Sequence, residues 1–355
     1  MKPLSQGPRR SSLGDVRAAP THAQYRHAAF TLIELLIAMF IALILAGLLL
    51  SIVRVTLTLW QRTQDNLSTA IQAKLAFDLL ERDLQSALFR PDGKIWLAVE
   101  INNSPNYLTA HGWLALTGLT KPNSPESQRL VGLASAQATP LISNARFGLS
   151  GAWLRLMTTN DEAVGGLPVA VAYQIARRPV SGPVSSGNPA AVRYTLFRAA
   201  VSAAHSFAVG ADVTAPGYGH TAVAPAASRN GATLTNPNST DALATNVVDF
   251  GLWLFVRDLP AGGLRRIFPA DGNDLTHTAV GSEGVADAHR FPVAVDVMMR
   301  ILTASGATLL AEIESGAARV SRPPHYSSDA EWWWALVETH SQVYTRRIEL
   351  KAVGW

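Results

Sequence analysis

Cysteine is absent from the 355-residue sequence. The chain therefore forms no disulfide, no cysteine-ligated zinc or iron–sulfur site and no thiol nucleophile. Charged residues are also few, at 16%, whereas hydrophobic residues make up 48%. This balance excludes a disordered acidic or basic chain and supplies enough apolar material for one large domain or two smaller ones.

Excess positive charge is missing from most of the chain. Residues 1–29 hold five basic residues, at positions 2, 9, 10, 17 and 26, against one acidic residue, Asp15. Because residues 1–29 account for the whole net charge of +4, residues 30–355 have a net charge of zero. This distribution argues against a nucleic-acid-binding surface in the body of the protein. It also predicts that the basic leader, 1–29, stays in the cytoplasm by the positive-inside rule.

The longest apolar run covers residues 30–53 and contains a single charged residue, Glu34. As a helix it would be about 36 Å long at ~1.5 Å per residue, enough to cross a bilayer core of about 30 Å. The apolar core of a secretory signal peptide is shorter, about 7–15 residues, and precedes a small-residue cleavage site that this run lacks. The run therefore predicts a transmembrane helix.

The helix is predicted to continue beyond the membrane, because neither Gly nor Pro occurs between Gly47 and Pro91. Its second half, 54–90, is expected to be amphipathic and to bury its apolar face under a sheet. Lys74, Asp78 and Arg82 are spaced by four residues and are expected to pair along a solvated face or to dock another subunit. Leu67 and Ile71 are also apolar at helical spacing, and the residues expected to pack under the sheet are Phe77, Leu80, Leu84 and Leu88.

After Pro91, short apolar runs alternate with Gly, Pro, Asn and Ser clusters, which is typical of a β-rich domain and is expected over 91–355. Within it, 202–246 lack periodicity and are expected to form a mobile surface insertion. The pattern Ser328-x-x-Glu331 predicts a helix to about His340, followed by a final strand at 343–351. Two-sided burial is expected at 169–173 and 293–299. The other predicted strands are 95–101, 113–116, 152–157, 169–175, 193–201, 247–256, 293–301 and 308–314.

Motifs for enzyme chemistry are scarce. After the leader no two histidines lie within four residues, so there is no HExxH pattern, and Walker and G-x-S-x-G motifs are absent. Residues 217–222 match G-x-G-x-x-A, but they follow no predicted strand and open no predicted helix. Asp271, Asn273 and Asp274 could bind Ca²⁺ in a turn, although the downstream Glu of an EF-hand loop is missing. The sequence predicts no enzyme, no catalytic residue, no resident metal and no cofactor.

Three consecutive tryptophans, 332–334, stand at the start of the predicted C-terminal helix. Neighbouring helical side chains point about 100° apart, so three indoles do not share one face. One interpretation places two in the core and leaves one exposed or against a sheet edge. The other makes them an aromatic contact with a neighbouring subunit.

Residues 29–38, Ala-Phe-Thr-Leu-Ile-Glu-Leu-Leu-Ile-Ala, resemble the N-terminal signature of type IV prepilins and type II secretion pseudopilins. That signature is a basic leader, a cut, an aromatic residue, T-L-[IV]-E and an apolar helix. The resemblance implies cleavage by prepilin peptidase between Ala29 and Phe30, followed by methylation of the new Phe30 amino group. Gly usually precedes the cut in the family, where this chain has Ala29.

A carboxylate five residues into a membrane helix is costly unless it is paired or lies near the interface. The resemblance implies that Glu34 pairs with the Phe30 amino group of a neighbouring subunit and sets the register of helices in a filament. The alternative is that Glu34 lies at headgroup depth and contacts water.

The resemblance further implies an α+β, pilin-like fold in which one long N-terminal helix packs on a C-terminal antiparallel β-rich domain. It implies a structural subunit of a type IV pilus or type II secretion pseudopilus, with prepilin peptidase and other pilin-like subunits as partners. The chain would cross the bacterial inner membrane once, with the C-terminal domain periplasmic or in a cell-surface filament. The large β-rich body is similar to minor members of the W pilin and J pseudopilin sort, and more narrowly to the Verru_Chthon cassette protein C group. The alternative function is a single-pass, membrane-anchored envelope receptor or enzyme.

Overall fold

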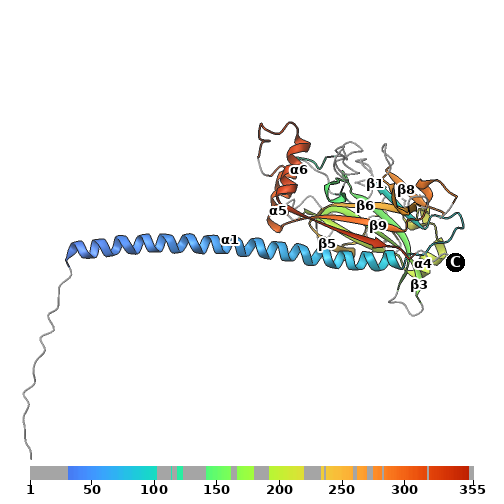
Figure 1. Ribbon diagram of the computed structural model, residues 1–355, viewed down its shortest axis with the longest axis horizontal. Helices are drawn as coiled ribbons and strands as arrows, with labels where there is room; N and C mark the ends of the chain where they lie inside the picture. The colour runs from blue at the N-terminus through green and yellow to red at the C-terminus, as the bar shows by residue number, and fades with distance from the viewer. Residues whose placement is uncertain are drawn as a thin grey trace, which may run out of the picture. The chain divides into compact units, whose positions relative to one another are not determined.

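The computed structural model describes residues 31–101, 113, 118–122, 141–160, 166–179, 192–219, 233–235, 237–258, 262–269, 275–281, 284–317 and 320–351. The chain divides into two compact units, Met1–Leu59 and Trp60–Trp355. A long N-terminal helix and two antiparallel sheets make up most of the described chain (Figure 1). The predicted α+β, pilin-like architecture is confirmed.

Helix α1 (Leu32–Gln85) is continuous, as the absence of proline predicts. It ends a few residues earlier than expected, because the following chain joins a sheet. Leu88 N donates to Met157 O at 2.8 Å, and Ala87 forms an isolated bridge with Thr158. The part of α1 up to Leu59 belongs to the first unit, and the part from Trp60 onward to the second.

The second unit contains both sheets, and their neighbouring strands pair antiparallel. The first sheet has six strands in the order β5 (Ala242–Thr245), β4 (Val192–Ala200), β3 (Leu167–Pro179), β2 (Ala152–Asn160), β1 (Leu97–Ile101) and β8 (Thr276–Ala279). The second has four strands in the order β10 (Ser341–Glu349), β9 (Ala294–Leu302), β6 (Val247–Asp258) and β7 (Gly263–Phe268). The short 3₁₀ helices are η1 (Ile142–Asn144), η3 (Pro216–Tyr218), η5 (Ser239–Asp241) and η6 (Asp287–His289).

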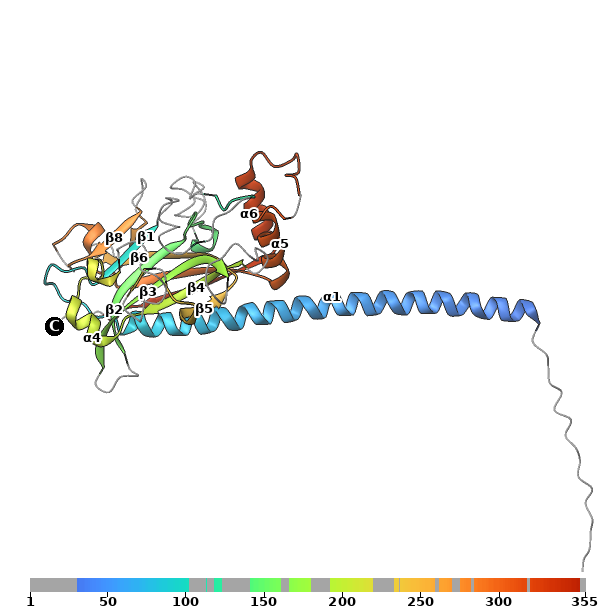
Figure 2. The same cartoon turned by 180° about the vertical axis from the view of Figure 1, so that it is seen from behind.

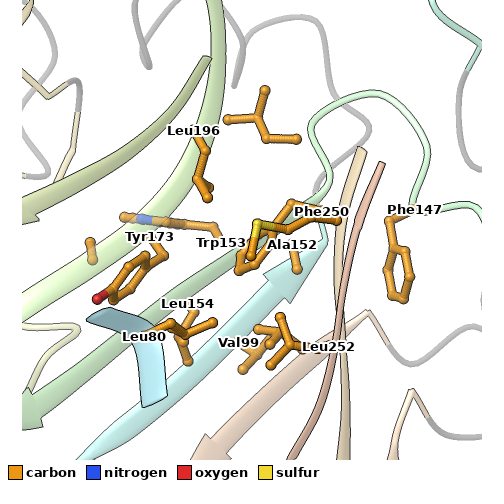
Figure 3. Packing of buried hydrophobic residues seen from close by; sticks show 14 of the residues in the cluster. Leu80, Val99, Phe147, Ala152, Trp153, Leu154, Tyr173, Leu196, Phe250 and Leu252 are labelled. Atoms are coloured by element: carbon orange, nitrogen blue, oxygen red, sulfur yellow. The ribbon is translucent and has the colours of Figure 1, made fainter. Parts of the chain in front are cut away.

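The C-terminal half of α1 packs against both sheets, as the amphipathic pattern predicts. Phe77, Leu80 and Leu84 are buried in the common core, and Figure 3 shows Leu80 beside Tyr173 and Leu154 of the first sheet. The same half contacts the edge strand of each sheet. Gln72 accepts a hydrogen bond from Thr245 N of β5 at 3.0 Å, and Figure 2 shows this stretch of α1 beside β5.

Described residues of segment 202–246 that precede β5 contact the face of the first sheet that is turned away from α1. In the segment predicted as an insertion, the described residues form α4 (Ala203–Val209), η3, η5 and strand β5; residues 220–232 and 236 lie outside the described residues. The side-chain amide of Gln174 on β3 donates to Leu234 O at 3.1 Å, and the buried Tyr218 contacts Met157 of β2. This cover explains the two-sided burial of β3, which the continuous apolar run at 169–173 predicts correctly.

The strand predicted at 308–314 is wrong, because these residues lie in helix α5 (Ala304–Glu314). Thr303 caps the helix by accepting a hydrogen bond from Gly306 N at 3.1 Å, and Leu310 and Glu314 are buried at helical spacing. Strands β5, β7 and β8 were not predicted. Trp113 is not in a strand, and the rest of the strand predicted at 113–116 lies outside the described residues.

Helix α6 (Asp329–Thr339) follows the predicted cap, in which Ser328 Oγ accepts from Glu331 N at 3.2 Å. It lies beside α5 in Figure 1, and β10 confirms the final strand. Two of the three tryptophans, Trp333 and Trp334, lie in the core as one interpretation predicts, and Trp332 is buried rather than exposed. The Trp333 indole donates to Glu314 of α5 at 2.9 Å, and the Arg146 guanidinium lies 4.8 Å from the Trp334 ring centre.

Candidate assembly helix

The N-terminus of α1 is closed by a reciprocal cap between Thr31 and Glu34. Thr31 N and Thr31 Oγ1 each donate to Glu34 Oε2 at 2.9 Å, and Glu34 N donates to Thr31 Oγ1 at 3.3 Å. This is a capping box, in which residues three apart satisfy backbone donors that the first helical turn leaves free. The cap explains why the helix begins at Leu32, immediately after Thr31.

The cap also orients the Glu34 carboxylate. Both of its hydrogen bonds go to Oε2, so Oε1 stays open toward any cation brought to this helix end; none of the described residues donates to it. A negative charge at this position is favoured by the helix dipole. The sequence pattern T-x-x-E signals this cap, which the interpretation of Glu34 as a pairing residue overlooked. Ala29 and Phe30 lie outside the described residues.

Residues of α1 within the first unit are exposed throughout their described length. In the part of the chain that the structure describes, α1 is the one helix whose length and composition suit a membrane span. Leu36, Phe40, Ile44 and Leu48 are among its exposed apolar side chains. Such a surface is stable in lipid or against other apolar helices, not in water.

A second exposed apolar surface follows on α1 in the second unit. Trp60, Leu67, Ile71 and Leu75 recur at steps of seven, four and four, which we call the outer stripe. Leu67, Ile71 and Leu75 are 54%, 52% and 61% exposed. At about 100° per residue the outer stripe lies roughly opposite the buried face that contains Leu80. The sequence pattern therefore combines two faces: Phe77, Leu80 and Leu84 are buried as predicted, whereas Leu67 and Ile71 are exposed.

The ladder of Lys74, Asp78 and Arg82 does not pair along α1. Asp78 instead forms an ion pair with Arg346 of β10 at 2.8 Å, and Glu81 contacts the same guanidinium at 2.8 Å. The hydrogen bond to Asp78 is the main cause that raises the pKa of Arg346 above its ordinary value. Lys74 and Arg82 are exposed. The spacing correctly predicted a charged face on α1, but it did not predict that Arg346 of β10 pairs with Asp78.

A buried carboxylate, Asp83, fixes the end of α1 to the first sheet. Arg198 of β4 donates to both of its oxygens, through Nε at 2.7 Å and Nη2 at 3.1 Å. The hydroxyl of Tyr173, which faces Arg198 across β3 and β4, donates to Asp83 Oδ2 at 2.5 Å. Burial, with the nearby Asp83 charge, raises the pKa of Tyr173 well above its ordinary value. No spacing in the sequence signals this contact, because it joins three distant elements.

The weak chemical motifs do not form a reactive site in the described residues. Gly217 and Tyr218 lie in η3, and the Tyr218 hydroxyl donates to Gly210 O at 2.5 Å, so this stretch of the G-x-G-x-x-A match is a packed turn. Asp271, Asn273 and Asp274 lie outside the described residues. Where side chains are described, no group of three metal-ligating residues is found.

Residues 25–50 match the family model of the prokaryotic N-terminal methylation motif. The chain thus carries a prepilin-type motif, which implies processing by prepilin peptidase and fits a membrane-anchored or envelope location. Proteins with this motif are typically structural rather than enzymatic. No curated protein and no solved structure matches the chain.

Proposed function

We propose that this chain is a subunit of a type IV pilus or type II secretion pseudopilus, assembled through α1. Prepilin peptidase cuts between Ala29 and Phe30, and the new amino group of Phe30 is methylated. The methylation motif supports the processing step. The two apolar faces of α1 support the assembly step.

The outer stripe is the observation that carries assembly. Leu67 lies about 52 Å along α1 from Leu32, at ~1.5 Å per residue, which is well beyond a bilayer core of about 30 Å. The inner face of this stretch is already occupied by the sheets. A helix that only anchors a receptor or an enzyme would leave the outer stripe exposed to water, which is unfavourable. Packing against neighbouring helices would bury the outer stripe.

Glu34 supplies the charge in this proposal. Its Oε2 holds the Thr31 cap, and its open Oε1 takes the amino group of Phe30 from a neighbouring subunit. Thr31 N remains a peptide nitrogen after the cut, so the cap persists in the processed chain. The same carboxylate therefore caps its own helix and pairs with the next one.

The proposal also specifies the kind of subunit. The second unit, Trp60–Trp355, is a large body built on two sheets, which supports a minor subunit of the W pilin or J pseudopilin sort. The narrower similarity to the Verru_Chthon cassette protein C group has the same basis. Such a body suits the tip of a filament or an initiating complex better than repeated packing along its length.

The test separates the charge of Glu34 from its cap. Glu34→Gln keeps the capping geometry, since Gln serves at this position as Glu does, but it removes the charge. Thr31→Ala removes the capping hydroxyl and keeps the charge. Both variants are expected to insert and to be processed. Crosslinking in membranes to pilin-like partners is expected to fall about a hundredfold or more for Glu34→Gln, the loss typical of breaking one side of a buried pair.

Thr31→Ala is the matched control and should retain crosslinking near the wild-type amount. Equal crosslinking in wild type and Glu34→Gln would show that Glu34 acts only as a cap. If neither the wild type nor the variants crosslink to any pilin-like partner, α1 is only an anchor and the assembly proposal fails.

A further inference from the structure

The core of the second unit buries a lysine next to an aspartate. Lys121, on the segment 118–122, and Asp249, on β6, both have completely buried side chains, and Lys121 Nζ lies 3.6 Å from Asp249 Oδ1. The ring centres of Tyr194 and Trp333 are 5.8 Å and 6.0 Å from Nζ. Nothing in the proposed assembly of α1 uses this pair.

Two close backbone contacts hold the pair in place. Gly118 N donates to Glu314 O at 2.9 Å, and a Cβ at Gly118 would lie 2.3 Å from Ile313 O, so only glycine lets the segment approach α5 this closely. On the other side, Phe147 N donates to Asp249 Oδ2 at 3.1 Å. The Phe147 ring lies against Gly251, where a Cβ would come within 1.8 Å of it.

If Lys121 and Asp249 form an ion pair, much of their hydrogen-bonding capacity is unused. A lysine ammonium has three N–H donors, and among the described residues Lys121 makes one hydrogen bond, to Val248 O at 2.6 Å. Asp249 Oδ1 is buried and accepts none from the described side chains or backbone. Groups left in this state are costly in an apolar core, because burial removes the water that would solvate them.

An amide formed between the two side chains would find a hydrogen-bond partner for both its N–H and its carbonyl oxygen. An amide between the two side chains has one N–H, and Val248 O is placed to accept it. Its carbonyl oxygen is the former Oδ2, which already accepts from Phe147 N. The oxygen without a partner, Oδ1, is the one an amide does not need.

We propose that Lys121 Nζ and Asp249 Cγ become joined by an intramolecular amide (isopeptide) bond once the domain folds. The Nζ–Cγ bond forms and the Cγ–Oδ1 bond breaks. Two ammonium protons leave with Oδ1 as water, and the third remains as the amide N–H. No oxidant, reductant or activating co-reactant is consumed.

The surroundings favour this condensation. Burial lowers the pKa of Lys121 against the opposing charge of Asp249, which makes the neutral amine needed for attack more accessible. Phe147 N–H is aimed at the oxygen on which negative charge develops. Folding holds the two groups together, which replaces a bimolecular encounter, and the dry core excludes the water that would reverse the reaction.

Intact-mass spectrometry of the full-length chain, purified in detergent and then denatured, tests the bond. The wild type is expected to be lighter than its processed sequence by the mass of one water molecule. Trypsin does not cut the Lys121–Pro122 bond, so the link should join peptide 95–129 to peptide 230–257. An ion pair would not survive denaturation.

Two variants separate the bond from other losses of water. Asp249→Ala should show no mass deficit and no linked peptides, whereas Asp249→Asn should form the same amide and lose ammonia in place of water. The proposal is overturned if the folded wild type has its full mass and Lys121 reacts with an amine reagent in denaturant. The wild-type measurement decides even if a variant fails to fold.

Discussion

Burial decides how much each charged residue of α1 contributes to the stability of the fold. Asp83 and Asp78 lie on the same helix, and each pairs with an arginine from a strand. The Asp83 side chain is 2% exposed and that of Arg198 is 21% exposed, against 49% for Asp78 and 31% for Arg346. Water screens the second pair but not the first.

Asp83→Ala is therefore expected to lower the free energy of unfolding by roughly 3–5 kcal/mol, because it leaves the Arg198 guanidinium without its buried carboxylate. Asp78→Ala, the matched control, should cost about 1 kcal/mol or less. Urea denaturation of the protein in detergent, followed by tryptophan fluorescence, measures both. Similar losses in the two variants would contradict the argument from burial.

Two buried tyrosines predict a loss of stability at alkaline pH. Burial, aided by the charges of Asp83 and Glu314, raises the pKa of Tyr173 and Tyr194 well above the ordinary value. Above the unfolded-state pKa of about 10 the unfolded chain releases these protons and the folded chain retains them. The free energy of unfolding should then fall by up to about 1.4 kcal/mol per pH unit for each tyrosine.

Denaturation at pH values from 8 to about 11 checks this slope. The variant with both Tyr173→Phe and Tyr194→Phe should lose less stability over the same range, because it has no buried phenol to hold protonated. An identical alkaline slope in the variant and the wild type would assign the loss to other groups.

At the scale of the element, α1 has an inner face for folding and an outer face for assembly. Leu80→Ala empties a buried position and is expected to lower the free energy of unfolding by about 2–5 kcal/mol. Ile71→Ala, in the outer stripe, should leave stability within about 0.5 kcal/mol and should instead reduce crosslinking to pilin-like partners. Melting curves and membrane crosslinking of the two variants give the two readouts. A large loss of stability in Ile71→Ala would mean that the outer stripe supports the fold.

Elements with strong local signals were predictable from the sequence. Helix α1 was predictable because its apolar spacing and lack of proline extend over many turns. Helix α6 was predictable because Ser328 and Glu331 mark its start. The segment 308–314 was not, because its apolar residues fit a buried strand as well as a helix, and Thr303 had not been recognised as a cap. The four-residue strands β5 and β8 are too short to show a period of two.

The candidate site was predictable only where its residues are close together in the sequence. The T-x-x-E pattern at Thr31 and Glu34 is local, so its cap could have been predicted from spacing alone. The partners of Asp83, Asp78 and Lys121 come from strands far along the chain. Only tertiary folding brings such residues together, and neither composition nor periodicity encodes which strand will lie beside which helix turn.

At the scale of the whole molecule, ion pairs and hydrogen bonds connect α1 to both sheets in the second unit. Thr69 Oγ1 and Tyr344 Oη lie 2.9 Å apart, which joins α1 to β10 of the second sheet. Asp83 joins the same helix to β3 and β4 of the first sheet. The helix is therefore part of the domain core as well as the segment through which the proposed subunit assembles, so displacement of the helix within a filament would act directly on both sheets.

The leader is the one part of the molecule that the proposed function removes. Its basic residues are expected to hold it in the cytoplasm, and the methylation motif at 25–50 spans its junction with the apolar helix, where we propose the cut. We expect the envelope protein to begin at Phe30 with a methylated amino group, as measured by intact mass and by sequencing of the N-terminal peptide. Ala29→Gly, which restores the residue usual in the family, should be processed at least as completely. Ala29→Leu, which places a bulky side chain beside the scissile bond, should accumulate as the uncut chain. Envelope protein that still begins at Met1 in the wild type would contradict the proposal, because an uncut Phe30 has no free amino group to offer to Glu34 of a neighbouring subunit.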